Sequence, residues 1–583
     1  MALNIADLFE HAADAVPGRL AIACGDAEIS YRELEDRSNQ LAHCLASNGV
    51  GRDDHVGVYG RNSIELIETI LACYKLRAIP VNVNYRYVEA ELRYLFAEAE
   101  LAGLVYDRQF SDKVAALLPD SPGIKAVLAI DDGSGVTLPP AAVDFSAAVA
   151  GASAVRDFGE RSADDTYMLY TGGTTGYPKG VLWRHEDVWR TLGGGIDFTT
   201  GEPLPDEWEQ IRRGTAGPAG MVRLTTAPLI HGSAQWGTLP GLFGGDTIVF
   251  VPQFDPHAVW RAVQRHRVNV LMITGDAMAR PLIEAYQQEE YDVSSVLAIS
   301  SNAALFSPSV KDQYLTLLPN VVITDAIGAS ETGFTGLGYV SAGNKKAEGP
   351  TVTAGPSTIV IDEHSRPVGP GGIGRIARGG HIPLGYYKDP AKTAALFAEV
   401  DGVRYAVPGD YARVEEDGSI TLLGRGNTCV NTGGEKVYPE EVEGALKSFG
   451  SVFDALVIGV PDARLGQRVA AVVQPRDGHD IDLTELEAHL RTQIAGYKVP
   501  RSVWLAEQIS RTPAGKADYR WARRYAEEQL AVTQEHAATA SAQATVAQTT
   551  DAQTTVAQTT GADTTNAAPG AEVTDAEAGV PGN

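Results

Sequence analysis

Short apolar runs alternate with longer amphipathic runs in the first part of the chain. The runs 54–60, 78–84 and 101–107 predict buried strands. The runs between them, 63–76 and 88–100, have the length and spacing of helices. Strands that alternate with helices are typical of parallel sheets whose faces are covered by helices. The large amino-terminal part of the chain is therefore predicted to be α/β.

The predicted helix 88–100 shows its spacing clearly. Val88, Leu92, Leu95 and Phe96 stand at i, i+4, i+7 and i+8. Residues at this spacing share one face of a helix, so we expect them to form one apolar stripe.

The pattern changes near the carboxyl end. Residues 438–449 predict a helix, and 454–461 and 467–475 predict two strands. A further helix is predicted to begin at a capping box made by Thr484 and Glu487. These elements predict a separate, small α+β domain.

Beyond this unit the chain loses its aromatic and basic residues, and the tetrapeptide Ala-Gln-Thr-Thr recurs. Such a segment cannot bury enough apolar surface to offset the entropy lost on ordering, so a disordered, low-complexity tail is predicted. We therefore expect three regions, a large domain at 1–425, a small domain at 426–530 and a tail at 531–583.

Composition narrows the classes of partner. The chain has 583 residues, 44% of them apolar, and a formal net charge of −26. Such a charge repels phosphate backbones and anionic membranes, which argues against nucleic acid as a partner. Any anionic ligand has to be held by local donors.

The cysteines and the amino terminus indicate the compartment. Cys24, Cys44, Cys73 and Cys429 are scattered singly, which argues against a disulfide framework and a zinc knuckle. The chain has no basic stretch followed by an apolar one at its start, and no run of about 18 apolar residues. We expect a cytoplasmic protein that is not an integral membrane protein.

A glycine-rich loop follows the apolar run 167–171. Its backbone amides, hydroxyls and ammonium group can surround phosphate oxygens. The candidate ligands are Thr171, Gly172, Gly173, Thr174, Thr175, Gly176 and Lys179. An ordinary glycine-rich hairpin is the alternative. A P-loop NTPase does not fit, because its loop ends in Gly-Lys-Ser/Thr, whereas here Pro178 precedes Lys179 and Gly180 follows it.

This loop resembles the phosphate loop of the adenylate-forming superfamily, which includes acyl-CoA synthetases, peptide-synthetase adenylation domains and luciferases. The match is close, although Gly173 stands where the family usually has Ser. The resemblance extends over about residues 5–525. It implies a large adenylation domain of several subdomains and a small carboxy-terminal domain that is mobile.

The segment AIGASETG at 326–333 resembles the family's magnesium-binding segment. The resemblance implies that Glu331 holds Mg²⁺ and that the Ser330 hydroxyl touches the phosphate. A carboxylate suits a hard cation beside triphosphate oxygens. Gly328 belongs to the same nucleotide segment, and Ile327 replaces the usual adenine-stacking tyrosine with an aliphatic face that can cover the purine.

Further segments imply contacts to the nucleoside. Asp410 in VPGDYARV corresponds to the acceptor of the ribose hydroxyls, and Arg425 in LLGRG joins it. The segment GYYKDPAKT at 385–393 matches another family signature, for which we infer only a structural role. A small-residue loop that lines the adenine, commonly Gly-Gly-Ala in the family, corresponds to Ser301, Asn302 and Ala303.

The resemblance also implies how the small domain acts. Asn427 stands at the hinge, where the family usually has Asp or Lys. Gly433 and Gly434 correspond to a loop that lines the pantetheine tunnel, where a Cβ would obstruct the thiol path. Lys516 in SRTPAGKADYR corresponds to the catalytic lysine, whose ammonium stabilises the charge on the carboxylate and phosphate oxygens during adenylation.

The segment APLIHGSAQWG at 227–237 is expected to meet the acid. His231 resembles the residue that gates the carboxylate, and Gly232, Gln235 and Trp236 lie near the implied acyl pocket. Neutral, small and aromatic side chains suit an apolar acid. A plain core role for Trp236 is the alternative. The long segment 191–222 either shapes this pocket or lies on the surface.

The resemblance implies an ATP-dependent acyl-CoA ligase that forms an acyl-adenylate and then a thioester, with ATP, Mg²⁺ and coenzyme A as cofactors and substrates. No Gly-Gly-x-Ser carrier site follows Lys516, so free coenzyme A is the expected acceptor. Longer stretches resemble actinobacterial ligases of the long-chain acyl class, including those that activate steroid side-chain acids.

Two alternatives stay open. One is an acyl-AMP ligase that loads a separate carrier protein, and the other is a non-catalytic nucleotide- or lipid-binding protein. A luciferase-type oxidation is compatible with the motifs, but no feature favours it. The expected partners are a small carboxylic acid, ATP and coenzyme A, and a homodimer is compatible with the sequence.

Overall fold

The computed structural model describes residues 4–171, 178–197, 200, 202–217, 220–341, 350–355, 357–426, 428–432, 435–462, 465–512 and 515–532. Met1–Ala522 form one compact unit, to which all the elements below belong, and Arg523–Asn583 form a second. Nearly all of the predicted tail lies outside the described residues. None of the described helices has both the length and the apolar character needed to cross a membrane.

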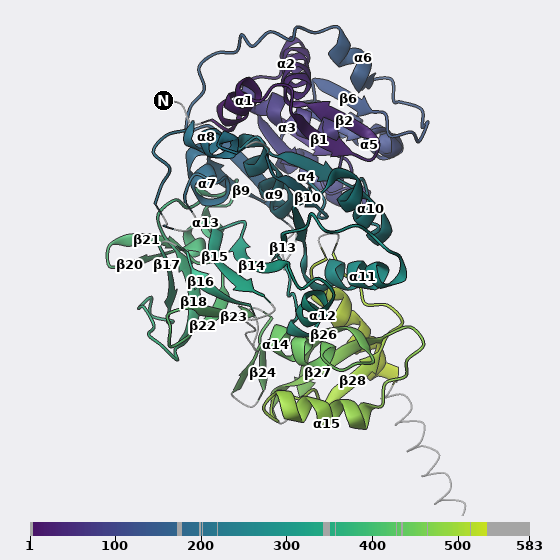
Figure 1. The fold of residues 1–583 in the computed structure, drawn as a ribbon, viewed down its shortest axis with the longest axis vertical. Helices are drawn as coiled ribbons and strands as arrows, with labels where there is room; N and C mark the ends of the chain where they lie inside the picture. The colour runs from purple at the N-terminus through teal and green to yellow at the C-terminus, as the bar shows by residue number, and fades with distance from the viewer. Residues whose placement is uncertain are drawn as a thin grey trace, which may run out of the picture. The chain divides into compact units, whose positions relative to one another are not determined.

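A five-stranded parallel sheet forms near the amino terminus, with strand order β4-β3-β5-β6-β7 (Figure 1). Its strands are β3 (His55–Tyr59), β4 (Ile79–Asn82), β5 (Leu101–Asp107), β6 (Ala126–Ile130) and β7 (Val143–Asp144). The helices α3 (Ile64–Lys75), α4 (Glu89–Glu98) and α5 (Ser111–Leu117) connect successive strands, and α6 (Phe145–Ala150) follows β7. Every residue of β3, β4, β5 and β6 is buried, as expected for a parallel sheet covered on both faces.

A second sheet contains fifteen strands and changes character along its length. The part from β1 to β14 is parallel, and the part beyond β14 is antiparallel. The first part comprises β1 (Leu20–Cys24), β10 (Val222–Thr225), β11 (Thr247–Phe250), β12 (Val270–Ile273), β13 (Ala298–Asn302) and β14 (Val322–Ala329), with β2 (Ala27–Ser30) on the edge. Its helices are α9 (Gly232–Phe243), α10 (Pro256–His266), α11 (Gly275–Gln288) and α12 (Pro308–Leu317).

The antiparallel part of this sheet carries several of the predicted nucleotide segments. Its strands are β15 (Gly333–Val340), β16 (Thr351–Ala354), β17 (Thr358–Ile361), β18 (Ile373–Arg378), β20 (Phe397–Val400), β21 (Val403–Ala406), β22 (Asp410–Val414) and β23 (Ile420–Arg425). A separate three-stranded sheet joins β8 (Thr166–Thr171), β9 (Lys179–Arg184) and β19 (Gly385–Tyr386). The remaining helices here are α1 (Ile5–Ala15), α2 (Tyr31–Ser47), α7 (His185–Leu192), α8 (Glu209–Thr215) and α13 (Pro390–Leu396).

The predicted small α+β unit is present. Its sheet contains β24 (Val430–Thr432), β25 (Glu435–Val437), β26 (Val452–Asp462), β27 (Gly466–Pro475) and β28 (Ser502–Leu505). The helices α14 (Pro439–Lys447) and α15 (Leu483–Gln493) pack on this sheet around a shared apolar core. The α/β class with parallel sheets and a carboxy-terminal domain is thereby confirmed, while the exact domain boundaries stay a prediction.

Two local predictions were wrong. Val88 is 60% exposed and occupies the N-cap of α4, so the apolar stripe consists of Leu92, Leu95 and Phe96 alone. The N-cap of α15 is Asp482 rather than Thr484, because the Asp482 carboxylate accepts hydrogen bonds from two backbone amides in the first turn.

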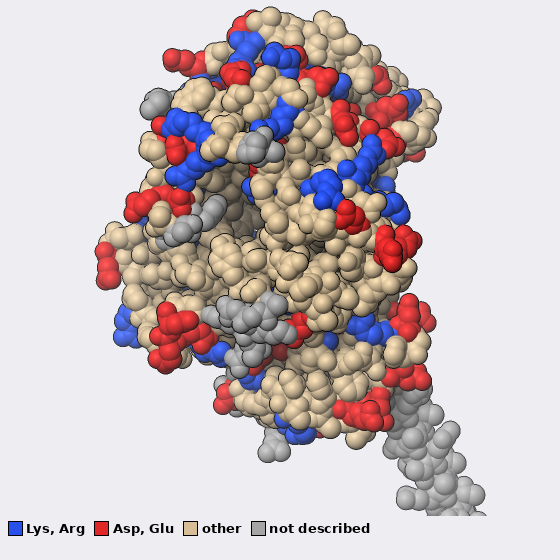
Figure 2. All heavy atoms as spheres, viewed as in Figure 1, with Lys and Arg blue, Asp and Glu red and all other residues tan. Residues whose placement is uncertain are grey.

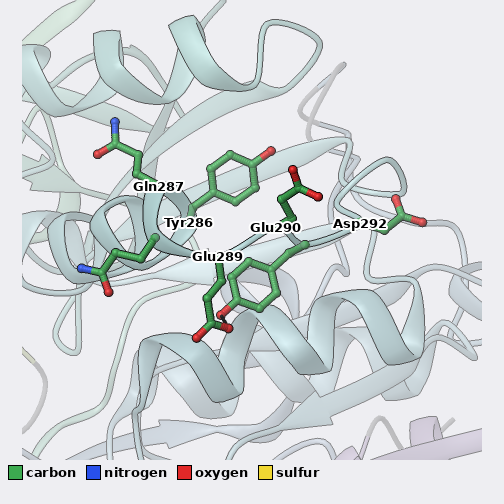
Figure 3. Close-up of a pocket in the computed structure, with 7 residues that line it drawn as sticks. Tyr286, Gln287, Glu289, Glu290 and Asp292 are labelled. Atoms are coloured by element: carbon green, nitrogen blue, oxygen red, sulfur yellow. Dashed lines mark hydrogen bonds between the residues drawn. The ribbon is translucent and has the colours of Figure 1, made fainter.

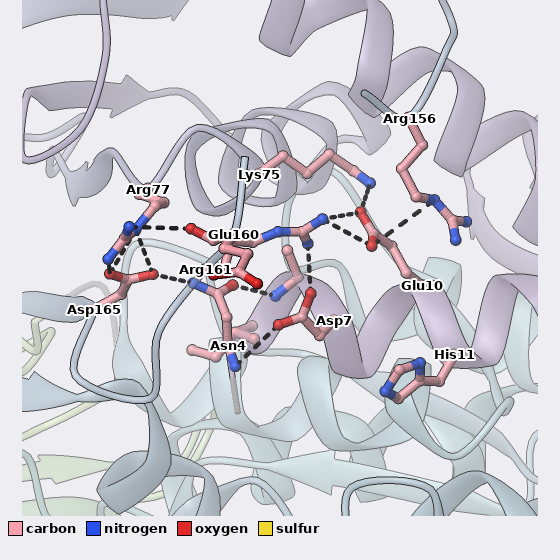
Figure 4. Close-up of polar contacts among 12 residues, drawn as sticks. Asn4, Asp7, Glu10, His11, Lys75, Arg77, Arg156, Glu160, Arg161 and Asp165 are labelled. Atoms are coloured by element: carbon pink, nitrogen blue, oxygen red, sulfur yellow. Dashed lines mark hydrogen bonds and ion pairs between the residues drawn. The ribbon is translucent and has the colours of Figure 1, made fainter. Parts of the chain in front are cut away.

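A network of buried charges pins the long segment between α6 and β8 onto helix α1 (Figure 4). The Lys75 ammonium lies 2.6 Å from Glu10 and 2.8 Å from Glu35, and its side chain is fully buried. Arg161 pairs with the same Glu10 at 2.9 Å. Asp165, which immediately precedes β8, accepts hydrogen bonds from the side chains of Asn4 and Arg77. The network therefore anchors the strand that leads into the glycine-rich loop.

Charged side chains of both signs are intermingled over the face shown in Figure 2. No broad basic surface appears among the described residues on that face. This distribution agrees with the expectation that anionic ligands are held locally rather than by a basic field.

We predict that Lys75→Met destabilises the protein by about 3 kcal/mol, because it leaves two buried carboxylates without their shared ammonium. Denaturant unfolding measures the change. Lys125→Met is the matched control, since Lys125 pairs with Asp54 at 3.1 Å on the surface and should matter by about 1 kcal/mol or less. Equal effects of the two substitutions would contradict the role of the buried network.

Candidate active site

The glycine-rich loop connects the two strands of a hairpin. β8 and β9 pair antiparallel, and Thr171 lies opposite Lys179 in the register. The two ends of the loop therefore lie side by side, as a loop that surrounds phosphate groups requires. The predicted ligands within the loop lie outside the described residues, namely Gly172, Gly173, Thr174, Thr175 and Gly176.

Asn82, at the end of β4, holds this hairpin in place. Its side-chain amide donates to the carbonyl of Tyr170 at 2.8 Å and to the carbonyl of Ile230 at 2.7 Å. Its oxygen accepts from the Tyr170 amide at 2.8 Å. One buried side chain thus joins the strand before the loop to the residue before His231. Sequence reasoning missed Asn82, because a single Asn in an apolar strand carries no motif.

The segment GYYKDPAKT contacts two of the predicted ATP ligands. The Asp389 carboxylate lies 3.0 Å from the Lys179 ammonium, and this pairing raises the pKa of Lys179. The Tyr386 hydroxyl donates to Glu331 at 2.9 Å. Strand β19 also pairs with β9. The interpretation of this segment as purely structural was therefore incomplete, because it joins the loop lysine to the predicted magnesium ligand.

Glu331 lies in the tight turn between β14 and β15. Trp183 donates its indole N–H to the Ser330 carbonyl at 3.0 Å, which fixes this turn against β9. Gly328 is required by packing, since a Cβ there would lie 2.4 Å from the carbonyl oxygen of Gly333. Turn and strand thus present the Glu331 carboxylate next to the hairpin.

The residues present fit a Mg²⁺ ion that arrives with ATP. Such an ion is held by one or two carboxylates together with the phosphates of the nucleotide. Glu331 is partly exposed, and the Tyr386 hydrogen bond engages only one of its two oxygens. No group of three or more metal-binding side chains occurs among the described residues. Glu331 would therefore hold the ion together with substrate oxygens.

The predicted adenine residues differ in their surroundings. Ile327 is only 8% exposed and packs in an apolar cluster with Val352 and Val360, so most of its side chain faces the protein interior. Ser301 accepts a hydrogen bond from the Gly275 amide at 3.2 Å. Asn302 ends strand β13, and Ala303 follows in the left-handed region with a φ of 63°. Such backbone strain in a residue other than glycine is concentrated at functional sites.

The predicted ribose ligands come together. Asp410 on β22 lies opposite Arg425 on β23 in the antiparallel register. The side chain of Arg425 lies outside the described residues, as do the hinge residue Asn427 and the tunnel residues Gly433 and Gly434.

His231 is held neutral at the start of α9. Burial, together with the positive charges of Lys516 and Arg86, lowers its pKa to about 3. Its Nε2 atom is buried and has no hydrogen-bond partner among the described residues. The structure therefore brings the predicted gate and the predicted catalytic lysine within electrostatic range. Arg86, which the motifs did not single out, contributes a further positive charge.

Lys516 is exposed and stands at the end of a tight turn. Its amide donates to the Thr512 hydroxyl at 3.0 Å, and its carbonyl accepts from the Thr512 amide at 2.8 Å. Gly515 has a φ of 73°, and a Cβ there would lie 2.9 Å from the Cβ of Ala277 on α11. The turn that carries Lys516 thus rests against the large domain.

The predicted acyl-pocket residues face the core. Gln235 accepts from the Tyr167 hydroxyl at 2.9 Å, and Trp236 donates to the same hydroxyl at 3.1 Å. Trp236 is 8% exposed. A Cβ on Gly232 would lie 2.5 Å from Leu169. These contacts favour the core role that the sequence left open for Trp236, and the assignment of these residues to the pocket stays a prediction.

The long segment 191–222 is anchored where it is described. Gln210 donates to the carbonyls of Gly193 at 2.9 Å and Pro240 at 3.1 Å. Leu204 and Ile211 are buried in the core. This part of the segment thus packs on α9, the helix that begins after His231.

A surface depression lies elsewhere, at the end of α11 (Figure 3). It is lined by Tyr286, Gln287, Gln288, Glu289, Glu290, Tyr291 and Asp292. None of the predicted site residues belongs to it.

Sequence comparison identifies the family. The sequence pattern of the AMP-binding enzyme family matches residues 9–387, and the pattern of the AMP-binding enzyme C-terminal domain matches residues 441–516. The chain therefore belongs to the AMP-binding enzyme family, which confirms the resemblance to adenylate-forming enzymes.

Curated relatives are similar over nearly their whole length. A 3-oxocholest-4-en-26-oate–CoA ligase of Rhodococcus rhodochrous is 54% identical over 90% of this chain and 96% of its own. A medium/long-chain-fatty-acid–CoA/3-oxocholest-4-en-26-oate–CoA ligase of Mycolicibacterium smegmatis is 54% identical over 93% of this chain and 100% of its own. These relatives confirm the predicted enzyme class, an AMP-forming acid–thiol ligase that uses ATP, Mg²⁺ and coenzyme A.

Solved structures share the fold. The anthranilate CoA ligase AuaEII in complex with anthranoyl-AMP has a TM-score of 0.79 at 19% identity, and covers 91% of this chain and 98% of its own. ATP-bound MatB from Rhodopseudomonas palustris has a TM-score of 0.74 at 26% identity, and covers 90% of this chain and 99% of its own.

We predict that Tyr386→Phe slows adenylation about tenfold, because Glu331 loses a hydrogen bond to a charged oxygen. Raising the Mg²⁺ concentration should restore part of the rate, and pyrophosphate exchange over a Mg²⁺ series measures both effects. Tyr387→Phe is the matched control, since the Tyr387 hydroxyl donates to exposed Glu100 at 2.9 Å. If both variants behaved alike, Tyr386 would have no specific role at Glu331.

Proposed function

We propose that this enzyme activates an apolar carboxylic acid, of the steroid side-chain or medium- to long-chain fatty type, and transfers the acyl group to coenzyme A. The observation that carries the proposal is the bridge made by one segment between Lys179 and Glu331, through Asp389 and Tyr386. This bridge supports the proposed roles of Lys179 in phosphate binding and of Glu331 in magnesium binding.

Each residue has a distinct task in this reaction. Lys179 binds phosphate oxygens once ATP displaces the Asp389 carboxylate from its ammonium. Lys516 stabilises the negative charge that gathers on the carboxylate and α-phosphate oxygens as the acid attacks phosphorus. His231, whose lowered pKa keeps it neutral, is proposed to contact the acid without pairing with its charge.

The acid is proposed from the relatives. Two of them, each 54% identical to this chain, carry the steroid acid 3-oxocholest-4-en-26-oate in their names, and one carries medium- and long-chain fatty acids as well. A cytoplasmic location and a homodimer belong to the same proposal. The loading of a separate carrier protein is the second candidate, since it shares the first half-reaction.

Carboxylate-dependent pyrophosphate exchange across fatty, aryl and steroid acids tests the proposal, because adenylation selects the acid. We expect exchange with the steroid side-chain or fatty acids and little with aryl acids. Product analysis with coenzyme A should show the thioester. Accumulation of acyl-AMP in the presence of coenzyme A would favour carrier loading, and no exchange with any acid would refute the proposal.

We predict that Lys516→Ala abolishes acyl-adenylate formation but leaves thioester formation from supplied acyl-AMP largely intact. The lysine acts on the charge that develops at phosphorus, and it is turned away from the nucleotide in the second half-reaction. Exchange assays and single-turnover thioester assays separate the two steps. Equal loss of both would show that Lys516 has another role.

A further inference from the structure

Three charged side chains are buried where helix α11 of the large domain meets helix α14 of the small one. The Lys447 ammonium lies 3.2 Å from Asp276 Oδ2, with side-chain exposures of 2% and 3%. Arg280, also 3% exposed, lies 3.7 Å from the same carboxylate and donates to the Lys447 carbonyl at 3.2 Å. Asp276 and Arg280 belong to α11, and Lys447 ends α14.

The charges depend on one another across this contact. Asp276 Oδ2 accepts no hydrogen bond from the described residues, so only the two cations balance it. The other oxygen, Oδ1, accepts from the Ser307 amide at 2.8 Å within the large domain. Separation of the helices would therefore break the link to Lys447 and keep the link to Ser307. The Lys447 ammonium is the part of the contact that depends on docking.

The buried charges continue through the small domain to the turn that carries Lys516. Glu443, one helical turn before Lys447, accepts from the Val457 amide and the Tyr519 hydroxyl, each at 3.0 Å. Burial raises the pKa of Glu443, and the charges of Lys447 and Arg511 oppose that rise. A chain of alternating charges thus runs from Asp276 through Lys447 and Glu443 to Arg511.

Arg511 is the last charge in this series and contacts the turn that carries Lys516. Two of its nitrogens lie 2.6 Å from the two oxygens of Asp454, and a third donates to the Gly515 carbonyl at 3.1 Å. Residue Arg511 also forms a β-bridge with Ala517, so it spans the turn that presents Lys516. Gly515 lies against Ala277, the residue after Asp276. The series of charges therefore begins at the first turn of α11 and ends at a turn that packs against the same place.

We propose that this buried ion network, formed by Asp276, Arg280, Glu443, Lys447, Asp454 and Arg511, positions Lys516 for adenylation by registering the small domain on α11. The inference rests on the proposed function, in which Lys516 acts on the acid and the α-phosphate. Lys447 and Arg511 are positioning residues, because they act through the turn and touch no substrate.

Ion pairs suit this task better than an apolar contact. A buried pair contributes little net stability, since desolvation offsets the attraction, but a wrong alignment leaves an unpaired buried charge. The contact therefore favours one docked position without making it permanent. When the domains part, Asp276 and Lys447 are rehydrated, so that undocking has no large penalty.

The test is Lys447→Met in the full-length enzyme, with both half-reactions measured separately. Pyrophosphate exchange should fall about 10- to 100-fold, because the buried Asp276 carboxylate loses its closer cation in the docked position. Thioester formation from supplied acyl-AMP should stay within about threefold of the wild type, which also shows that the variant is folded. Asp276→Asn on the large domain should give the same split, since Asn keeps the Oδ1 acceptor for Ser307.

Lys498→Met is the matched control. Lys498 pairs at 2.5 Å with Glu441 on the same helix α14, but this pair lies within the small domain. Its exchange activity should match the wild type. The triple variant Asp276→Leu/Arg280→Met/Lys447→Met, which removes all three buried charges at this contact, should regain exchange relative to Lys447→Met.

The outcomes distinguish failure of the proposed function from failure of the proposed role of the ion network. If wild type shows no acid-dependent exchange, the proposed function fails. If wild type exchanges and both Lys447→Met and Asp276→Asn do so at the same rate, the network does not position Lys516. Equal loss of the two half-reactions in both variants would likewise overturn the inference, because it would show a general structural role.

Discussion

A protein with a net charge of −26 has to bind a polyanionic nucleotide through a few local donors, and the fold is arranged around that constraint. The hairpin β8–β9 brings Thr171 opposite Lys179, and Asn82 ties its first strand to the residue before His231. The segment that follows β19 pairs the Asp389 carboxylate with the Lys179 ammonium, and we propose that phosphate takes the place of this carboxylate. Each donor is held by contacts that come from a different part of the chain.

The contact between the two domains likewise depends on a few paired charges. Lys516 is exposed on a short turn, and we propose that it acts in catalysis only when the small domain docks in one position. Asp276 and Lys447 are buried at that contact, and Arg511 in the small domain donates a hydrogen bond to the Gly515 carbonyl in the turn. Their desolvation makes misalignment costly, whereas their hydration on separation keeps the contact reversible. We therefore propose that nucleotide binding and domain docking both depend on paired charges of opposite sign.

Most candidate site residues could be named from the sequence because they occur in short, ordered motifs, and their roles stay predictions. The loop before Lys179, the turn with Glu331 and the turn with Lys516 each appear as contiguous residues with special chemistry. The bridging roles of Tyr386 and Asp389 were missed, although their segment was noticed, because a motif does not reveal which distant side chain it touches. Asn82 had no signal in the sequence, since its partners lie in strands and loops far along the chain.

The sequence by itself determined the α/β class, the strands and helices of the first sheet and the identity of the family, because these follow from periodicity and local motifs. Only the tertiary structure decided that Ile327 and Trp236 are largely buried, that Asp482 rather than Thr484 caps α15, and that Lys447 meets Asp276. Burial and ion pairing depend on which surfaces meet after folding. No local pattern carries that information, because the partners are brought together by the packing of whole elements.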